Sequence, residues 1–304
     1  MSPAAPPAEP PAAEDRPRVP AVPASSLVLV RPGAGGETSV FTVRRAGTMA
    51  FSAHATAFPG GRVDPADDLP DRLWEGTDLA DWGRRLGLPH EPVDAHGTLT
   101  ELDPAEGAGR VLAAAVRETF EETGVLLARD AVTGTPVDPA RVAAFPDELR
   151  DAVERHEVDF GELLDREGLR PDVGALVPWS RWITPHGGPR RYDTFFFAVH
   201  LPQGQSPERM SSEAASHGWA SPAELLRRFR AGEVNLMAPT WWQLRTLVDA
   251  GEDIHAGRSR FEPLEGVMLV AGQGPVFPHA DEYLRDLTAF RAAAQVEESK
   301  DNIL

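Results

Sequence analysis

Three glutamates stand close together in the stretch AAAVRETFEETGVLL, residues 113–127: Glu118, Glu121 and Glu122. If this stretch is helical, Glu118 neighbours the other two, and each like-charged pair destabilises the helix by about 0.2–0.5 kcal/mol. Arg117 offsets part of this repulsion because it lies four residues before Glu121. A divalent cation would offset far more. Taken alone, however, a glutamate-rich helix face is more often solvated than metal-binding.

The elements that position these glutamates follow from apolar periodicity and turn residues. The glutamates are expected on a helix that begins near Pro104–Gly107 and ends at Gly124, because glycine commonly ends a helix in a left-handed conformation. Residues 26–30 and 37–45 read as two strands joined by the turn PGAGG, which predicts a hairpin. Further helices are predicted in DLADWGRRLGL, residues 146–169, SPAELLRRFRAG and PTWWQLRTLVDAG, and further strands in ALVPWSRWITP and RRYDTFFFAVHL.

Composition places the chain among folded proteins that do not bind nucleic-acid polymers. It has 304 residues, 41% of them hydrophobic, which is enough to bury a sizeable core. The formal charge of −17 repels a nucleic-acid backbone. The absence of cysteine excludes disulfide scaffolds, thiolate metal sites and cysteine nucleophiles. No uninterrupted apolar run approaches the ~18 residues of a membrane span, and no secretory signal is evident, so we expect a cytoplasmic protein without a membrane partner.

The chain is expected to hold one domain between two extensions. Residues 1–24 are dominated by proline and alanine and lack an apolar face, which predicts a disordered tail. The domain is expected to span residues 25–250. Residues 251–304 are interpreted as a C-terminal extension packed on that domain, with strands around FEPLEGVMLV, a terminal helix and a charged tail.

Joined to the upstream stretch FPGGRVDPAD, the glutamate helix resembles the Nudix box, written G-x5-E-x7-R-E-U-x-E-E-x-G-U with U apolar. Gly61 and Asp67 resemble the first half of the box, and residues 117–125 resemble the second half. Three positions depart from the pattern: Asp67 replaces a glutamate, Thr119 takes an apolar position, and 49 residues separate Asp67 from Arg117 where the pattern has seven.

An insertion of this length resembles the coenzyme A diphosphatases within the Nudix hydrolases. The stretches RWITP and RRYDTFFFA, the pattern E-x5-W-x-SPAE from Glu213, and LMAPTWWQL are also similar to that subfamily, so the resemblance runs from about residue 26 to 250. It implies a fold of the α/β (α+β) class, a Nudix-like α/β/α sandwich with a mixed β-sheet. The insertion, at about residues 68–108, is expected to pack outside this sandwich.

The resemblance also implies a site for Mg²⁺, with Mn²⁺ as an alternative. Glu118 and Glu122 would be direct ligands, Glu121 a ligand directly or through water, and the carbonyl of Gly60 a further one. Hard oxygen donors of this kind suit Mg²⁺, which usually keeps several waters. Arg117 would orient a glutamate by charge-assisted hydrogen bonding.

The remaining box residues are assigned to structure or to substrate approach. Gly61 lacks a Cβ and would let a phosphate come close. Asp67 and Gly124 are interpreted as structural. Arg190 and Arg191 would contact substrate phosphates, or equally would pair with nearby acids.

Residues further along the chain supply candidates for the proton acceptor. Glu213 would bind a further metal ion or take the proton from water, and His217 is an alternative base. Three tryptophans, Trp182, Trp241 and Trp242, are interpreted as core residues rather than adenine-stacking ones.

The function that follows is metal-dependent hydrolysis of a diphosphate linkage, with Glu118, Glu121, Arg117 and Glu213 as catalytic residues. The resemblance favours coenzyme A or acyl-CoA as substrate, cleaved to 3′,5′-ADP and (acyl-)4′-phosphopantetheine. Alternatives are ADP-ribose, nucleotide sugars or dinucleotides, or a non-catalytic module that binds a nucleotide or acyl-CoA. Because all three box glutamates and Arg117 are present, an enzyme is favoured. Its partner would be a small-molecule diphosphate, and a homodimer stays open.

Overall fold

The computed structural model describes residues 20–45, 54–88, 102–184, 190–207, 214–251, 254, 263–265 and 277–301. Its α-helices are α1 (Leu79–Arg85), α2 (Pro104–Thr123), α3 (Pro139–Ala143), α4 (Asp147–Glu154), α5 (Phe160–Arg166), α6 (Pro222–Arg230), α7 (Ala238–Ala250) and α8 (Ala280–Asp301). Its strands are β1 (Ala21–Pro32), β2 (Thr38–Arg45), β3 (Ala55–Ala57), β4 (Gly60–Arg62), β5 (Ala128–Asp130), β6 (Leu169–Pro171), β7 (Val177–Ile183), β8 (Arg191–His200), β9 (Ala214–Ala220), β10 (Asn235–Leu236) and β11 (Pro263–Glu265). Short 3₁₀ helices cover Pro65–Asp67, Asp71–Trp74 and Val173–Ala175.

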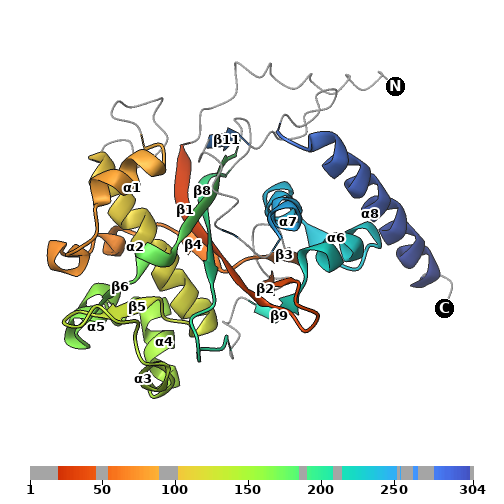
Figure 1. The fold of residues 1–304 in the computed structure, drawn as a ribbon. Helices are drawn as coiled ribbons and strands as arrows, with labels where there is room; N and C mark the ends of the chain where they lie inside the picture. The colour runs from red at the N-terminus through yellow and green to blue at the C-terminus, as the bar shows by residue number, and fades with distance from the viewer. Residues whose placement is uncertain are drawn as a thin grey trace, which may run out of the picture.

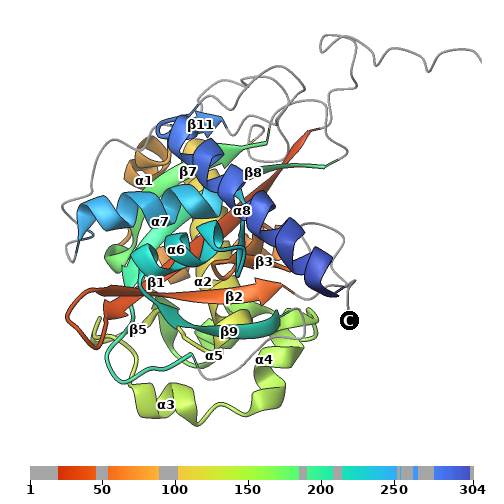
Figure 2. The same cartoon turned by 90° about the vertical axis from the view of Figure 1, so that its right-hand side faces the viewer.

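One mixed sheet of nine described strands forms the centre of the molecule, with helices on both faces (Figure 1). Its main path is β10-β3-β2-β1-β8-β7-β11, while β4 pairs with β1 and β9 with β2. The pair β1–β8 is parallel and the pairs β1–β2 and β7–β8 are antiparallel. Helices α1 and α2 cover one face, and α6, α7 and α8 cover the other (Figures 1 and 2). The predicted α/β/α sandwich with a mixed sheet is therefore confirmed.

Strand β1 carries the alternation that divides the core between the two faces. Successive side chains of a strand point to opposite faces. Leu27 and Leu29 accordingly join the core cluster beneath α2, whereas Val28 and Val30 join the one beneath α6 and α7. The predicted hairpin is confirmed, because Val30 pairs with Val40 across β1 and β2.

The start of β1 corrects the predicted limit of the N-terminal tail. Ala21 and Ala24 are buried and pair in register with Arg191 and Thr194 of β8. Residues 21–24 therefore belong to the sheet. The proline and alanine content of this stretch predicted disorder. Its pairing with β8 is a long-range contact, which local composition does not reveal.

Helix α2 begins and ends where its capping residues place it. The carboxylate of Asp103 accepts a hydrogen bond from the backbone N–H of Ala105 at 2.9 Å, and Pro104 occupies the first turn. Gly124 follows the last turn with φ 76° and donates its N–H to the carbonyl of Phe120. The predicted helix is confirmed. Its first residues, 104–108, overlap the end of the expected insertion and belong to the helix.

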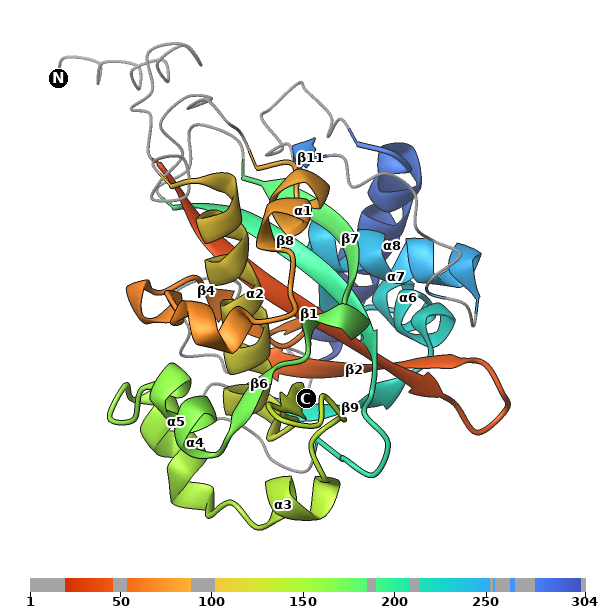
Figure 3. The ribbon, with the colours of Figure 1, turned by 60° about the vertical axis from the view of Figure 1, so that its left-hand side comes forward.

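The rest of the described insertion corrects the expectation that this segment packs outside the sandwich. Trp82 of α1 and Leu86 directly after this helix are buried in the core cluster beneath α2, together with Leu73 and Trp74 before it. Figure 3 shows α1 beside α2. The apolar periodicity of DLADWGRRLGL predicted this helix, but it did not indicate which part of the molecule the apolar face packs against.

The C-terminal helix α8 lies against α6 and α7 (Figure 2). The buried carboxylate of Asp286 accepts hydrogen bonds from Trp241 Nε1 at 3.0 Å and from Arg230 Nη1 at 3.2 Å. Trp182 and Trp241 are core residues, as predicted, and the half-buried Trp242 packs edge-on against Trp182. None of the helices in the described ranges is long and apolar enough to cross a membrane.

Candidate active site

The end of α2 lies along the edge of β4 that faces away from β1. Backbone groups of the residues flanking β4 bond to β1: Leu27 N–H donates to Pro59 O at 2.8 Å, and Val63 N–H donates to Pro23 O at 2.9 Å. Since hydrogen-bonding direction alternates along a strand, the backbone groups of Gly60 and Arg62 point outward. They meet α2 there.

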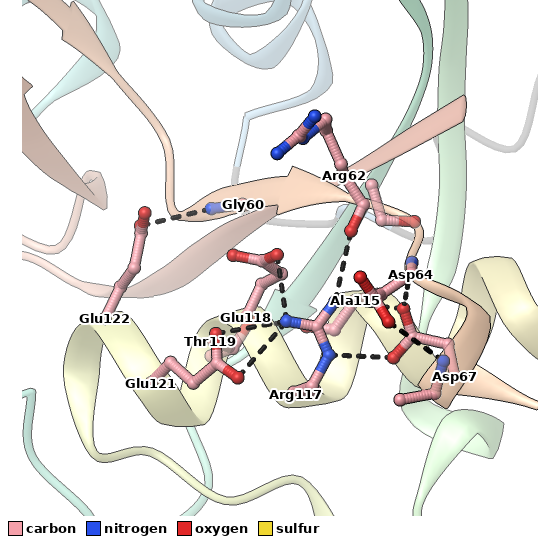
Figure 4. Close-up of polar contacts among 12 residues, drawn as sticks. Gly60, Arg62, Asp64, Asp67, Ala115, Arg117, Glu118, Thr119, Glu121 and Glu122 are labelled. Carbon is pink, nitrogen blue, oxygen red and sulfur yellow. Dashed lines mark hydrogen bonds and ion pairs between the residues drawn. The ribbon is translucent and has the colours of Figure 1, made fainter. Parts of the chain in front are cut away.

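Two hydrogen bonds join this outward edge to the end of α2 (Figure 4). The N–H of Gly60 donates to Glu122 Oε2 at 3.1 Å, and the carbonyl of Arg62 accepts from Arg117 Nη2 at 3.1 Å. Arg117 and Glu122, five positions apart on α2, are thereby held against a three-residue strand. The two halves of the Nudix box, which are far apart in the sequence, are therefore in contact here.

Arg117 is the centre of the polar network in Figure 4. Its Nε and Nη2 donate to the two carboxylate oxygens of Asp67 at 2.8 and 2.9 Å. Its Nη1 donates to Glu118 Oε1 at 3.0 Å and to Glu121 Oε2 at 3.1 Å. The side chains of Arg117, Asp67 and Glu121 are 5%, 0% and 6% exposed. One buried guanidinium thus faces three carboxylates.

Asp67, which stands where the Nudix box has the longer glutamate, has its side chain held in a fixed geometry. It ends the 3₁₀ helix Pro65–Asp67, where its Oδ2 accepts the backbone N–H of Asp64 at 2.7 Å. The Asp64 side chain reciprocates by accepting from the N–H of Ala66 at 2.9 Å. This capping box directs the Asp67 carboxylate toward Arg117, 50 residues further along the chain.

Burial sets the protonation of the two glutamates that Arg117 contacts. Burial raises the pKa of Glu118 to about 7, because the opposing charge of Arg117 compensates only in part and Glu121 adds repulsion. Burial likewise raises the pKa of Glu121, again against the charge of Arg117. The pKa of Arg117 is itself raised: burial lowers it, but Asp67, Glu118 and Glu121 together outweigh that effect. The cluster is short of positive charge.

The two glycines at the start of β4 make room for neighbouring groups, the Glu118 carboxylate at Gly61 and the backbone of β1 at Gly60. A Cβ on Gly61 would lie 2.4–2.5 Å from the carboxylate atoms of Glu118. A Cβ on Gly60, whose φ is 148°, would lie 2.3 Å from the carbonyl oxygen of Ser25. Neither position has room for a larger residue without movement. Thr119, at an apolar position of the box, is buried and donates its hydroxyl to the carbonyl of Ala115 at 2.7 Å.

The donor set fits a divalent cation in charge and chemistry. Within the described ranges, no three acidic or histidine side chains are already gathered as a metal-ligand group. Arg117 holds Glu118 and Glu121, and Gly60 holds Glu122, so the ligands stand apart in this arrangement. The hard carboxylate oxygens nevertheless suit Mg²⁺ or a similar ion, and the raised pKa of Glu118 reflects a buried cluster that lacks positive charge.

The structure does not bring the two candidate arginines to this cluster. Arg191 is buried and donates from Nε to the carbonyl of Thr184 at 2.7 Å, while Arg190 is exposed. Arg191 pairs with Ala21 of β1, whereas Gly60 pairs with Ser26, five residues and roughly 16 Å further along that strand.

Of the two candidate bases, His217 lies on β9. His217 is exposed, with its ring 5.4 Å from that of Phe41. Glu213 lies outside the described residues.

Sequence reasoning missed Asp64 and Arg62, whose contacts depend on the turn and register around β4. The DP pair before Asp67 was the available signal for the first of them.

Comparison with known proteins agrees with this geometry. The chain matches the family described as the NUDT19 Nudix domain over residues 21–247. A Gallus gallus protein named acyl-coenzyme A diphosphatase NUDT19 is 32% identical over 271 residues, which cover 76% of this chain and 70% of that protein. The Homo sapiens protein of the same name is 29% identical over 293 residues, covering 86% and 76%.

A solved structure has the same fold. The crystal structure of a Nudix hydrolase from Alicyclobacillus acidocaldarius is 29% identical to this chain, with a TM-score of 0.57, and the match covers 81% of this chain and 99% of that one. The match to the family spans both halves of the box, from Gly61 through Glu122, and the strands around them. The chain therefore belongs to the NUDT19 Nudix family of pyrophosphohydrolases.

Proposed function

We propose that the chain hydrolyses the diphosphate linkage of coenzyme A or acyl-CoA to 3′,5′-ADP and (acyl-)4′-phosphopantetheine, using a divalent cation. The observation that carries the chemistry is the cluster of Asp67, Glu118 and Glu121 around the single guanidinium of Arg117 at the outward edge of β4. The substrate is proposed from the names of the Gallus gallus and Homo sapiens relatives, which match over most of their own lengths.

The cation would be held by Glu118, Glu121, Glu122 and the carbonyl of Gly60. That carbonyl belongs to the outward-facing residue of β4, beside the carboxylate of Glu122. Mg²⁺, or Mn²⁺ in its place, would neutralise charge on the transferring phosphoryl group and activate water. Because the cluster is short of positive charge, cation binding would also release the proton that the raised pKa of Glu118 favours.

The chain's own residues orient these ligands. Arg117 holds Glu118 and Glu121 by charge-assisted hydrogen bonds, and Asp67 fixes the guanidinium in turn. Gly61 leaves the space that the Glu118 carboxylate occupies. Arg117 therefore acts as a positioning residue, and its effect on turnover passes through the glutamates.

Two further roles are assigned by proposal. Glu213 accepts the proton from the attacking water, with His217, exposed on β9, as the alternative base. Arg190, exposed at the start of β8, contacts the 3′-phosphate of coenzyme A at a distance from the diphosphate. Arg191 supports it by holding the β7–β8 hairpin through Thr184.

A substrate panel tests the proposal. Purified protein with Mg²⁺ is incubated with coenzyme A, dephospho-CoA, ADP-ribose, a nucleotide sugar and a dinucleotide, and the products are separated by chromatography. We expect coenzyme A to be cleaved fastest and dephospho-CoA more slowly, with Arg190→Ala reducing that difference. Cleavage of ADP-ribose or a nucleotide sugar with no cleavage of coenzyme A would reject the substrate while leaving the hydrolase chemistry in place.

A further inference from the structure

Arg62 is the exposed last residue of β4, the strand that lies against the carboxylate cluster. Its backbone is fixed, because its carbonyl accepts the hydrogen bond from Arg117 Nη2 at 3.1 Å. Side chains alternate along a strand, and the Cβ direction of Gly61 points at Glu118. The Arg62 side chain must therefore leave the opposite face of β4. Figure 4 shows its guanidinium on the side of the strand away from α2.

Arg62 has no acidic partner among the described residues. Arg72, Arg117 and Arg181 are each bound by a carboxylate, whereas other described arginines, such as Arg190 and Arg285, lack an acidic partner as Arg62 does, so the argument depends on where Arg62 lies. The carboxylates of Glu118 and Glu122 are bound elsewhere, to Arg117 and to the N–H of Gly60. The guanidinium is thus charged, exposed and available to an anion.

Its position suits an anion held at the outward edge of β4. Arg62 lies two residues from Gly60, whose N–H contacts Glu122. The carboxylates approach this edge from the α2 side, and Arg62 approaches it from the other side. A diphosphate at this edge would lie between them. A guanidinium can bind two phosphate oxygens at once through a rigid planar fork of donors, a geometry that neither a backbone N–H nor a lysine has.

We propose that Arg62 contacts the diphosphate of the substrate from the face of β4 opposite Glu118. The inference rests on the proposed function for the identity of the anion. It assigns the diphosphate to Arg62, leaving the distant 3′-phosphate to Arg190. Arg62 is then a phosphate-contacting residue that stabilises the charge of the diphosphate throughout the reaction.

The test compares Arg62→Ala and Arg62→Gln with Arg62→Lys and with a matched control, Arg285→Ala. Arg285 is an exposed arginine of α8, so its removal changes the net charge equally. Two quantities are measured: kcat/KM for coenzyme A with Mg²⁺, and the affinity for inorganic pyrophosphate with Ca²⁺ by calorimetry. We expect Arg62→Ala and Arg62→Gln to lower both by about 10- to 100-fold, the range for losing a charged hydrogen bond.

Melting temperatures of all variants should match the wild type, because Arg62 is exposed, and Arg62→Lys should restore part of the loss. The inference is overturned if Arg62→Ala behaves like Arg285→Ala in both measurements. If the wild type cleaves no diphosphate of the panel but Arg62→Ala weakens pyrophosphate binding, the phosphate contact stands and the proposed function fails. If the wild type cleaves coenzyme A and Arg62→Ala has no effect, the reverse holds.

Discussion

At the scale of single residues, the site is defined by an imbalance of charge. Arg117 is the one guanidinium hydrogen-bonded to Asp67, Glu118 and Glu121, and all of these side chains are largely buried. A buried ion pair is weak evidence of stabilisation in itself, but removing one partner leaves an uncompensated charge. The same imbalance makes the cluster receptive to a divalent cation and sensitive to pH.

Replacing Asp67 by Asn should destabilise the protein by about 3–5 kcal/mol, because Arg117 loses a bidentate carboxylate in a buried setting. Urea unfolding measures this. Asp68→Asn is the matched control: its carboxylate is 55% exposed and pairs with Arg110 at 3.1 Å, so its removal should cost less than about 1 kcal/mol. Equal effects of the two substitutions would contradict the assigned role of Asp67.

Without metal, stability should fall as the pH rises, because burial raises the pKa of Glu118 from its ordinary 4.5 to about 7. The folded protein therefore holds the proton of Glu118 more tightly than the unfolded chain does. The resulting contribution to the free energy of unfolding is fully present below pH 4.5 and is lost as the pH rises through about 7. Glu118→Gln lacks it. Its stability relative to the wild type, measured in EDTA, should therefore rise by about 1–3 kcal/mol from about pH 5 to pH 8.

A control separates this effect from a general response to losing a glutamate. The pKa of Glu224 in α6 is lowered by its hydrogen bond to Arg227, the opposite sign. Glu224→Gln should therefore show no gain over the wild type as the pH rises. A flat difference for Glu118→Gln across the same range would refute the account of Glu118.

The sequence allowed the box residues to be named, together with the pairing of Arg117 and a glutamate, but not the partner of Asp67. The match of residues 117–125 to the Nudix box identified Arg117 and the glutamates from type and spacing alone. The partner of Asp67 could not be found, because the contact spans 50 residues and depends on a 3₁₀ turn. Arg62 was overlooked for a similar reason, since its importance depends on which way β4 faces.

At the scale of elements, the site is a close approach of α2 to β4. Helix α2 was predictable because its signals are local: an aspartate cap, a proline in the first turn and a glycine after the last. Strand β4 was not, since three residues containing two glycines have no period to detect. The register of β4 on β1 then decides which of its backbone groups reach α2.

Substituting Ala for Gly61 tests that approach. The added Cβ would lie 2.4–2.5 Å from the Glu118 carboxylate, so the flexible end of that side chain must move. We expect the free energy of unfolding to fall by no more than about 1–2 kcal/mol, while turnover falls by at least about tenfold. Gly218→Ala in β9 is the control, because nothing lies within 4 Å of its Cβ position. Full activity of Gly61→Ala would show that Glu118 need not stay in place.

Strand β1 supplies a second test at this scale. Deleting residues 1–24 removes Ala21 and Ala24, which are buried and paired with β8, so melting temperature should drop. Deleting residues 1–19 instead should have little effect, because that composition cannot bury a core. Differential scanning fluorimetry of both truncations decides the point, and equal melting temperatures would mean that the first residues of β1 are dispensable.

At the scale of the whole molecule, the family match includes the insertion but ends before the C-terminal helix α8. The family match ends at residue 247, yet Tyr283 of α8 is buried in the core cluster beneath α6 and α7. Trp82 of the insertion is likewise part of the cluster beneath α2. The layered architecture followed from the resemblance, and the C-terminal extension was expected to pack on the domain. The burial of Trp82 in the insertion was not expected.

The central claim is that the carboxylates at the end of α2 support cation-dependent hydrolysis of a diphosphate. Its most direct test is mass spectrometry of the products formed from coenzyme A in ¹⁸O-labelled water, with Mg²⁺ or with EDTA. We expect 3′,5′-ADP and 4′-phosphopantetheine, one of them carrying a single ¹⁸O, and no products in EDTA. Glu122→Gln, folded as well as the wild type, should be slower by about 100-fold or more. Undiminished turnover in EDTA or by Glu122→Gln would contradict the claim.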